Sequence, residues 1–373
     1  MPDHDVVIVG AGPVGLLCAC LLAAEGVDVA VVERREGGDR RTKAIGIHPP
    51  GLAALDAAGV GGAVRAEGLR LDGGDVLSRG RVLTAVDFGS DRPVLTLPQP
   101  RTDALLRARL AGLAADPLVG EATAVRDEGG FVRVAVRRGG RTAEITGALV
   151  VAADGVRSPI RRSLGVGWTP RAGTASYAMV DVADPSGGTR AHLHCEPGGL
   201  VESFPLPGGA RRWVVRLDPR THPGTPGPVD LAAVIAQRTG ERPDIPGDVR
   251  VAGFQAAQHV VPTVVHGRTI LLGDAAHEIS PIGGQGMNLG WLDAVRLVDP
   301  VVRALATGTP ELGAYARDGR RRARAVQRRA SFYMAMGAPA SGAALWSREA
   351  LIRALGSSPI RGWSAGLVTM RGI

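Results

Sequence analysis

Lysine, cysteine and aromatic residues are scarce in this sequence. Lys43 is the only lysine among 373 residues, so the formal net charge of +8 comes almost wholly from arginine. The densest arginine run, residues 317–329, contains no aromatic side chain of the kind that stacks on nucleic-acid bases. A solvated helix face explains this run better than a nucleic-acid or acidic-lipid site, and we expect no nucleic-acid partner.

The three cysteines are too few and too irregularly placed for a disulfide framework. Cys18 and Cys20 lie two positions apart on a predicted helix, where their side chains point in different directions. The third cysteine, Cys195, then has no further cysteine with which to pair. Buried free thiols in a reducing compartment are therefore the better interpretation.

Residues 6–24 form a long stretch without a charged residue. Asp3 and Asp5 precede it, where a signal peptide would carry basic residues, and a glycine-rich turn interrupts it. The stretch therefore divides into a strand, a turn and a helix and is not predicted to span a membrane. We expect a cytoplasmic protein and leave peripheral membrane contact open.

A glycine pattern joins two predicted strands, residues 5–9 and 27–32, and opens a predicted helix over residues 13–24. The pattern reads Gly10-Ala11-Gly12-Pro13-Val14-Gly15. Its first glycine permits a tight turn, its second lets the backbone approach a pyrophosphate at the helix N-terminus, and its third allows close packing of helix on strand. Glu33 closes the unit and can accept hydrogen bonds from a ribose. This context predicts a dinucleotide site without distinguishing FAD from NAD.

Two further predicted strands end in an Asp-Gly or Gly-Asp pair. Residues 148–152 lead into Asp154-Gly155, and residues 269–272 lead into Gly273-Asp274. The second pair is followed by Pro281-Ile282-Gly283-Gly284-Gln285-Gly286-Met287-Asn288 and by a predicted helix that begins near Met287. A glycine-rich linker is a poor alternative, because such linkers rarely lie between a buried strand and an apolar helix.

In order and spacing, these three motifs resemble the group A FAD-dependent monooxygenases, the para-hydroxybenzoate hydroxylase-like family with its aromatic polyketide hydroxylases. The resemblance covers about residues 4–330. It assigns FAD contacts to Gly10, Gly12, Pro13, Gly15, Glu33, Arg41, Lys43, Gln99, Arg101, Asp154, Asp274, Pro281, Gly284, Gly286, Met287 and Asn288. Lys43 replaces an arginine of the family, which keeps the attraction to phosphate but loses the planar fork. The resemblance gives His277 a structural position behind the flavin.

The resemblance also implies an α/β fold, with a Rossmann-like FAD-binding domain, an inserted antiparallel β-sheet substrate domain and C-terminal helices. We expect the discontinuous FAD-binding domain at residues 1–70, 98–170 and 260–330. The substrate domain would take residues 71–97 and 171–259, and the closing helices residues 331–373. His48, Phe204 and Trp213 are the candidate substrate contacts.

The implied reaction is hydroxylation or epoxidation of an aromatic or polyketide-like substrate by O2 through a C4a-hydroperoxyflavin, with NADPH or NADH as a transient reductant. An FAD-dependent reductase or dehydrogenase of a prenyl or other hydrophobic substrate is the alternative, and a flavin-fold carrier without redox turnover is a third hypothesis. The sequence identifies no catalytic acid or base. It also shows no metal-ligand spacing and no Ser-His-Asp pattern with supporting context.

Overall fold

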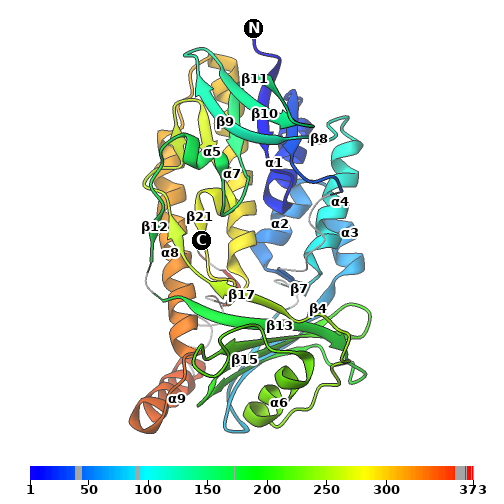
Figure 1. The fold of residues 1–373 in the computed structure, drawn as a ribbon, viewed down its shortest axis with the longest axis vertical. Coiled ribbons are helices and arrows are strands. Elements are labelled where there is room, and N and C mark those ends of the chain that lie inside the picture. Colours follow the sequence, from blue (N-terminus) through cyan, green and yellow to red (C-terminus); the bar gives the residue numbers. More distant parts are fainter. Residues whose placement is uncertain are drawn as a thin grey trace.

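The computed structural model describes residues 1–37, 44–89, 93–171, 173–357, 366, 368–370 and 372. Within these ranges two large sheets lie at opposite ends of an elongated molecule (Figure 1). The long helix α8 (Gly313–Met336) runs along one side of the molecule from the first sheet to the second. The two sheets are therefore held in place by helices and loops that pass between them.

The first sheet has eight strands in the described chain and is built around the parallel strands that the glycine motif predicts. The path β19-β20-β11-β1-β2-β8 is extended by a hairpin in which β10 pairs with β11 and β9. Val6, Val7 and Ile8 of the central strand are fully buried, as expected for a parallel sheet covered on both faces. The strands are β1 (His4–Val9), β2 (Val29–Glu33), β8 (Leu118–Val119), β9 (Glu121–Asp127), β10 (Val132–Arg138), β11 (Arg141–Ala152), β19 (Val265–His266) and β20 (Thr269–Leu271).

Helix α1 (Pro13–Ala24) is buried over most of its surface, because it packs against both α4 (Gln99–Ala111) and α7 (Gln285–Thr307). Its apolar character on all sides is what such a central position requires. Trp291 of α7 is fully buried and donates its indole N–H to the carbonyl of Pro13 at 3.0 Å. The start of α7 is thereby fixed against the start of α1.

The second sheet has seven strands among the described residues, in the order β17-β13-β16-β15-β14-β5-β6. Its neighbours are antiparallel except for the parallel pair β14–β5. One face packs on α6 (Pro228–Thr239), and the other packs on α8 and on Ile282. The strands are β5 (Gly73–Ser78), β6 (Arg81–Asp87), β13 (Ala175–Ala183), β14 (Arg190–Glu196), β15 (Gly199–Leu206), β16 (Ala210–Leu217) and β17 (Ala252–Ala256).

Short elements connect the two sheets. One small sheet has the order β3-β7-β4 and another the order β12-β18-β21. Their strands are β3 (Gly46–Ile47), β4 (Leu69–Leu71), β7 (Val94–Thr96), β12 (Thr169–Pro170), β18 (His259–Val260) and β21 (His277–Glu278). The remaining helices are α2 (Pro49–Ala57), α3 (Gly61–Glu67), α5 (Pro159–Ser163), the 3-10 turn η1 (Gly273–Ala275) and α9 (Gly342–Gly356).

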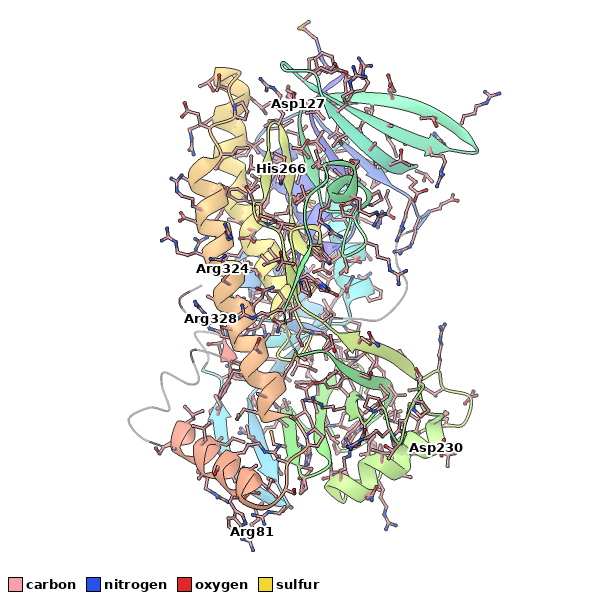
Figure 2. The ribbon with its side chains drawn as sticks, turned by 60° about the vertical axis from the view of Figure 1, so that its left-hand side comes forward. Arg81, Asp127, Asp230, His266, Arg324 and Arg328 are labelled. Atoms are coloured by element: carbon pink, nitrogen blue, oxygen red, sulfur yellow. The ribbon has the colours of Figure 1, made fainter. Side chains whose placement is uncertain are left out.

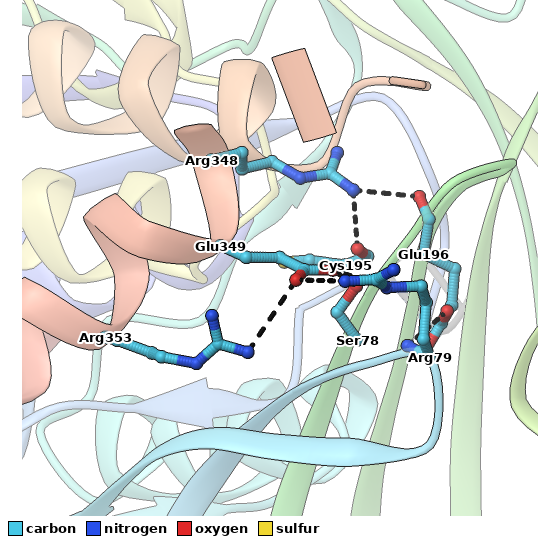
Figure 3. A network of polar contacts seen from close by, with 7 residues as sticks. All are labelled: Ser78, Arg79, Cys195, Glu196, Arg348, Glu349 and Arg353. Carbon is cyan, nitrogen blue, oxygen red and sulfur yellow. Dashed lines mark hydrogen bonds and ion pairs between the residues drawn. The ribbon is translucent and has the colours of Figure 1, made fainter. Parts of the chain in front are cut away.

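Helix α9 is attached to the edge of the second sheet by a buried polar network (Figure 3). Glu349 accepts hydrogen bonds from Arg79 Nε at 2.9 Å, from Arg79 Nη2 at 2.6 Å and from the Ser78 hydroxyl at 2.9 Å. The preceding residue of α9, Arg348, donates to the carbonyls of Cys195 and Glu196 at 2.6 and 3.1 Å. These contacts fix α9 across the end of the β5–β6 hairpin.

The arginine run of the sequence lies on α8. Arg324 and Arg328 point away from the body of the molecule (Figure 2) and are exposed, whereas Arg322 is turned inward and buried. The predicted boundary at residue 331 falls inside α8, which continues to Met336. Among helices of the described ranges, none combines the length and the apolarity that crossing a bilayer requires.

Candidate cofactor and substrate site

The glycine turn after β1 is pressed against the end of β11. Gly10 has a φ of +101°, and a Cβ placed there would lie 2.5 Å from the carbonyl oxygen of Ala153. A Cβ at Gly15 would lie 2.0 Å from the carbonyl oxygen of Gly10. At Gly12, by contrast, no described atom comes within 4 Å of such a Cβ. Two glycines are thus needed for packing, whereas the third leaves open space outside the turn.

The N-terminus of α1 faces that open space. Gly12 is the N-cap and provides no side chain to cap the first-turn amides, and Pro13 has no N–H of its own. Free amides and the positive end of the helix dipole make a site for an anion. The carboxylate of Glu33 accepts a hydrogen bond from the Ala11 amide at 2.8 Å, and this bond fixes the turn.

Arg107 of α4 also reaches this turn, a contact that the sequence argument missed. Its Nη2 donates to the carbonyl of Ala11 at 3.0 Å. The guanidinium therefore stands beside the open N-terminus of α1 and adds positive charge there. Only the packing of α4 against α1 brings it in, and the spacing of residues in the sequence contains no signal for that contact.

Asp154 lies where β11 ends, next to the glycine turn. Its Oδ2 accepts the amide of Ile160 at 3.2 Å, whereas its buried Oδ1 has no hydrogen-bond partner among the described residues. Burial raises the pKa of this carboxyl above its ordinary value. Arg161, farther along the same motif, donates to the carbonyls of Ala275 and Val156 at 3.1 and 2.6 Å. Arg161 thereby joins the second motif to the third. The Oδ1 of Asp154 remains without a hydrogen-bond partner in the described structure.

The third motif begins with a turn that requires glycine and ends in a helix N-terminus. Gly273 has a φ of +59°, and Asp274 is exposed between buried neighbours. The amide of Gly284 donates to the carbonyl of Pro281 at 2.9 Å, and Gly284 has a φ of +64° as the N-cap of α7. This helix begins at Gln285, two residues before the predicted start, and it has no side-chain cap within the described structure. Gly286 and Met287 are half-buried in its first turn.

Asn288 holds this loop against the segment that follows the first motif. Its Oδ1 accepts the amide of His48 at 2.9 Å, and its Nδ2 donates to the carbonyls of Gly46 and Gly284 at 3.0 and 2.9 Å. His48 in turn contacts the carbonyl of Gly283 through Nε2 at 3.2 Å. Burial lowers the pKa of His48 to about 4, so the ring is neutral and Nε2 carries the donated proton.

His277 is buried in β21, which precedes this loop. Its Nε2 lies 2.9 Å from Asp293 Oδ2, and Asp293 Oδ1 accepts two hydrogen bonds from Arg322, at 3.0 and 2.8 Å. The three side chains connect β21 with α7 and α8. Both oxygens of Asp293 are occupied within the protein, which gives this cluster a structural position.

The remaining predicted FAD contacts have different surroundings. Gln99 is buried, and its backbone N–H donates a hydrogen bond to the carbonyl of Ala44 at 3.0 Å. Arg101 points to the surface and pairs with Glu67, with Nη2 to Oε1 at 2.6 Å. The structure therefore does not bring Arg101 to the glycine turn. Arg41 and Lys43 lie outside the described residues.

Two of the three candidate substrate contacts, Phe204 and Trp213, lie on opposite faces of the second sheet, whereas His48 precedes α2. Trp213 packs with Leu231 and Ile235 of α6, on the face opposite Ile282. The physical reason is the two-residue alternation of β16, which turns Val214 and not Trp213 toward Ile282. Phe204 is half-buried on the same face as Val214.

A flavin dinucleotide fits the groups that these motifs leave open. The space beside Gly12 and the uncapped start of α1 suit a pyrophosphate, and the Oδ1 of Asp154, which has no partner in the described structure, is an acceptor for a hydroxyl group. The second uncapped helix, α7, offers its positive end to an electron-rich ring. We take the residues present to be compatible with FAD.

Comparisons with known proteins agree with this fit. The family model described as FAD binding domain matches residues 3–330. The chain is 35% identical over 315 residues to 6-methylpretetramide 4-monooxygenase of Streptomyces rimosus, covering 79% of this chain and 56% of that protein. It is 32% identical over 331 residues to anhydrotetracycline monooxygenase of the same organism, covering 83% and 65%. The chain thus spans less than two thirds of the length of these two relatives.

Among solved structures, p-nitrophenol 4-monooxygenase PnpA of Pseudomonas putida DLL-E4 superposes with a TM-score of 0.86, covering 99% of this chain and 98% of that one. The sequence identity is 23%, so this likeness shows the fold alone. The family match over most of the chain and the open groups at the three motifs lead to one conclusion: this chain belongs to the FAD-binding domain family whose members include the flavin-dependent aromatic and polyketide monooxygenases.

Proposed function

We propose that this chain is an FAD-dependent monooxygenase that hydroxylates or epoxidises an aromatic or polyketide-like small molecule, with NADPH or NADH as reductant and O2 as oxidant. One observation carries the proposal. The loop from Pro281 to Gly284, which precedes the uncapped start of α7, is continuous through Ile282 with the apolar face of the second sheet. A site for the reactive part of a flavin thus adjoins a surface suited to an aromatic molecule. The named relatives support the same reaction class.

The chain's own residues bind and orient the cofactor. The first-turn amides of α1, with Arg107 beside them, hold the pyrophosphate, and Glu33 keeps the turn in shape through the Ala11 amide. Asp154 and Asp274 would accept hydrogen bonds from hydroxyl groups of the cofactor. FAD, when bound, supplies hydride acceptance and the activation of O2; the protein positions the partners and controls their surroundings.

The loop of the third motif controls charge and water. The positive end of α7 favours negative charge that develops beside the loop. His48 stays neutral there because burial lowers its pKa to about 4, and it fixes the Gly283 carbonyl by donating a hydrogen bond. Pro281 cannot act as an acid or base. We assign Pro281 and Ile282 to shaping the site and excluding water.

The domain organisation follows from the same proposal. The FAD-binding domain takes residues 1–70, 98–170 and 260–330, and the seven-stranded sheet of residues 71–97 and 171–259 is an inserted substrate-binding domain. Val214 packs with Ile282 on one face of this sheet, and Phe204 lies on the same face in a separate cluster. The opposite face packs on α6 and forms the hydrophobic core of the domain. The helices of residues 331–373 close the substrate side, with α8 extending across that boundary.

The test is NAD(P)H consumption under air by purified, FAD-loaded protein, with a panel of phenols and aromatic polyketides. We expect substrate-stimulated consumption and a product heavier by one oxygen atom in mass spectrometry. An anaerobic reaction is the control and should yield no product. Product formation that continues without O2, with no oxygen gained, would contradict the proposal and point to an FAD-dependent reductase or dehydrogenase.

A further inference from the structure

One acidic residue interrupts an apolar row that crosses the second sheet. Glu202 lies on β15 and is paired with Leu193 on one side and Val214 on the other. The strand register extends this row through six strands, as Val76, Leu193, Glu202, Val214, Met179 and Ala252. Side chains at paired positions stand on the same face, so a carboxyl group lies in the middle of an aliphatic surface.

This face is the one that meets the loop of the third motif. Val214, the cross-strand partner of Glu202, packs in one cluster with Leu200 and Ile282. Val201, one residue away on β15, packs instead in the cluster that includes α6. Because strand side chains alternate, Glu202 points toward Ile282 and not toward α6.

Glu202 is buried, and within the described ranges one of its carboxyl oxygens lacks a hydrogen bond. It is 3% exposed, and its Oε1 has no hydrogen-bond partner in the part of the chain that the structure describes. Two other buried carboxylates differ, because Glu349 accepts from Arg79 and Asp293 accepts from Arg322. An unpaired buried carboxyl contributes nothing to folding and costs free energy, whereas the other two stabilise contacts between elements.

The groups around Glu202 do not neutralise it. On the same sheet face Tyr177 and Cys195 are both buried, and burial raises the pKa of each to about 12, so both are uncharged at neutral pH. Arg216, the cross-strand partner of Tyr177, donates to the carbonyl of Met334 on α8 at 2.8 Å. Burial alone raises the pKa of Glu202 to about 8. The carboxyl is thus held largely protonated at neutral pH, where it can both donate and accept a hydrogen bond.

We propose that Glu202 hydrogen-bonds a hydroxyl group of the bound aromatic molecule and so orients its ring between the second sheet and the Pro281–Gly284 loop. The proposal rests on the proposed function in one respect, namely that this sheet face receives the substrate. It explains why a carboxyl whose Oε1 has no hydrogen-bond partner among the described residues lies in an apolar row. The aliphatic neighbour Val214, which packs with Ile282, would contact the ring itself.

The test compares the binding of two probes to the FAD-loaded protein. Naphthol carries a hydroxyl group, and methoxynaphthalene has the same ring without a donor; binding is followed as a change in flavin absorbance. We expect the wild-type protein to bind naphthol about ten-fold more tightly than the ether, the effect of one hydrogen bond to a buried group. Glu202→Met should abolish this preference, and Glu202→Gln should retain part of it.

Leu193→Met is the matched control, because it changes a neighbour in the same row without removing a polar group. It should leave the preference for naphthol unchanged. A preference that persists in Glu202→Met, or that is missing from the wild-type protein, would overturn the inference. The binding measurement needs neither NAD(P)H nor O2, so a failure of oxygenation would refute the proposed function without affecting this result.

A second readout separates recognition from a structural role. Glu202→Met removes an unpaired carboxyl and should raise the unfolding temperature of the FAD-loaded protein in the absence of probe. A fall in the unfolding temperature would show that the carboxyl holds the fold together and would count against the inference.

Discussion

Replacing Gly12 with alanine should separate cofactor binding from folding. Gly12 has φ −78° and ψ 179°, which alanine adopts without strain, and no described atom lies within 4 Å of the added Cβ. The protein without cofactor should therefore keep its stability or gain slightly, by about 0.4–1 kcal/mol, because alanine restricts the unfolded chain more than glycine does. The added methyl group would instead occupy the space that we assign to the pyrophosphate.

The loss of FAD affinity follows from crowding at that position. Inserting a methyl group into a closely packed contact costs about 1–3 kcal/mol. The dissociation constant for FAD should accordingly rise by about 5- to 150-fold. Gly15→Ala should behave differently, because its Cβ would lie 2.0 Å from the Gly10 carbonyl oxygen and would damage the fold itself.

The assay is a titration of the cofactor-free protein with FAD, followed by flavin fluorescence, together with thermal unfolding of the cofactor-free protein. Gly62→Ala is the control, since Gly62 lies exposed in α3 and no described atom lies within 4 Å of an added Cβ there. Unchanged FAD affinity in Gly12→Ala, with normal affinity in the control, would refute the placement of the pyrophosphate at the start of α1.

Three further predictions concern buried polar groups. The folded-state pKa of Glu202, about 8 against an ordinary 4.5, means that burying this carboxyl costs least below pH 4.5, where it is protonated in both states, and that the cost grows as the pH rises to about 8. The pKa of His48 is lowered from 6.5 to about 4, so its burial makes the stability of the protein rise, not fall, as the pH increases to 6.5. The stability of the wild-type protein relative to Glu202→Gln should therefore fall between pH 6.5 and 8 in denaturant titrations, and parallel pH profiles would contradict this. Glu349→Ala should lower the free energy of unfolding by about 2–3 kcal/mol in urea, below the range for fully buried pairs because the Arg79 side chain is 39% exposed; a change under about 0.5 kcal/mol would argue against a stabilising network. Asn288→Ala removes three hydrogen bonds and should cost about 2–4 kcal/mol and weaken FAD binding; the same titrations measure both effects, and unchanged FAD affinity would show that the loop keeps its shape without the amide.

Local patterns were enough to predict the nucleotide-binding unit. Helix α1 begins and ends where the sequence predicts, and β1 and β2 differ from the predicted strands by one or two residues at their ends. The reason is that glycine turns and apolar strands are dictated by neighbouring residues. The three cysteines are buried and free, as expected. Helix α6 lies within the predicted substrate region and was not predicted from the sequence.

Contacts between distant segments could not be predicted in the same way. Alternation along β16 separates Trp213 from Val214 but does not reveal which face meets the loop of the third motif. Arg101 has a nearby acid, Glu67, that the sequence does not mark as its partner, whereas Arg107 reaches the glycine turn only through the packing of α4. Such contacts depend on the three-dimensional arrangement of helices and not on spacing along the chain.

The most direct test of the central claim is the origin of the oxygen atom in the product. FAD-loaded protein, NADPH and an accepted phenol would be incubated under heavy-isotope O2, with mass spectrometry of the product. The account predicts one heavy oxygen atom in each product molecule and none when the label is supplied in water. A product without the label from O2, or a reduced product with no added oxygen, would contradict a monooxygenase.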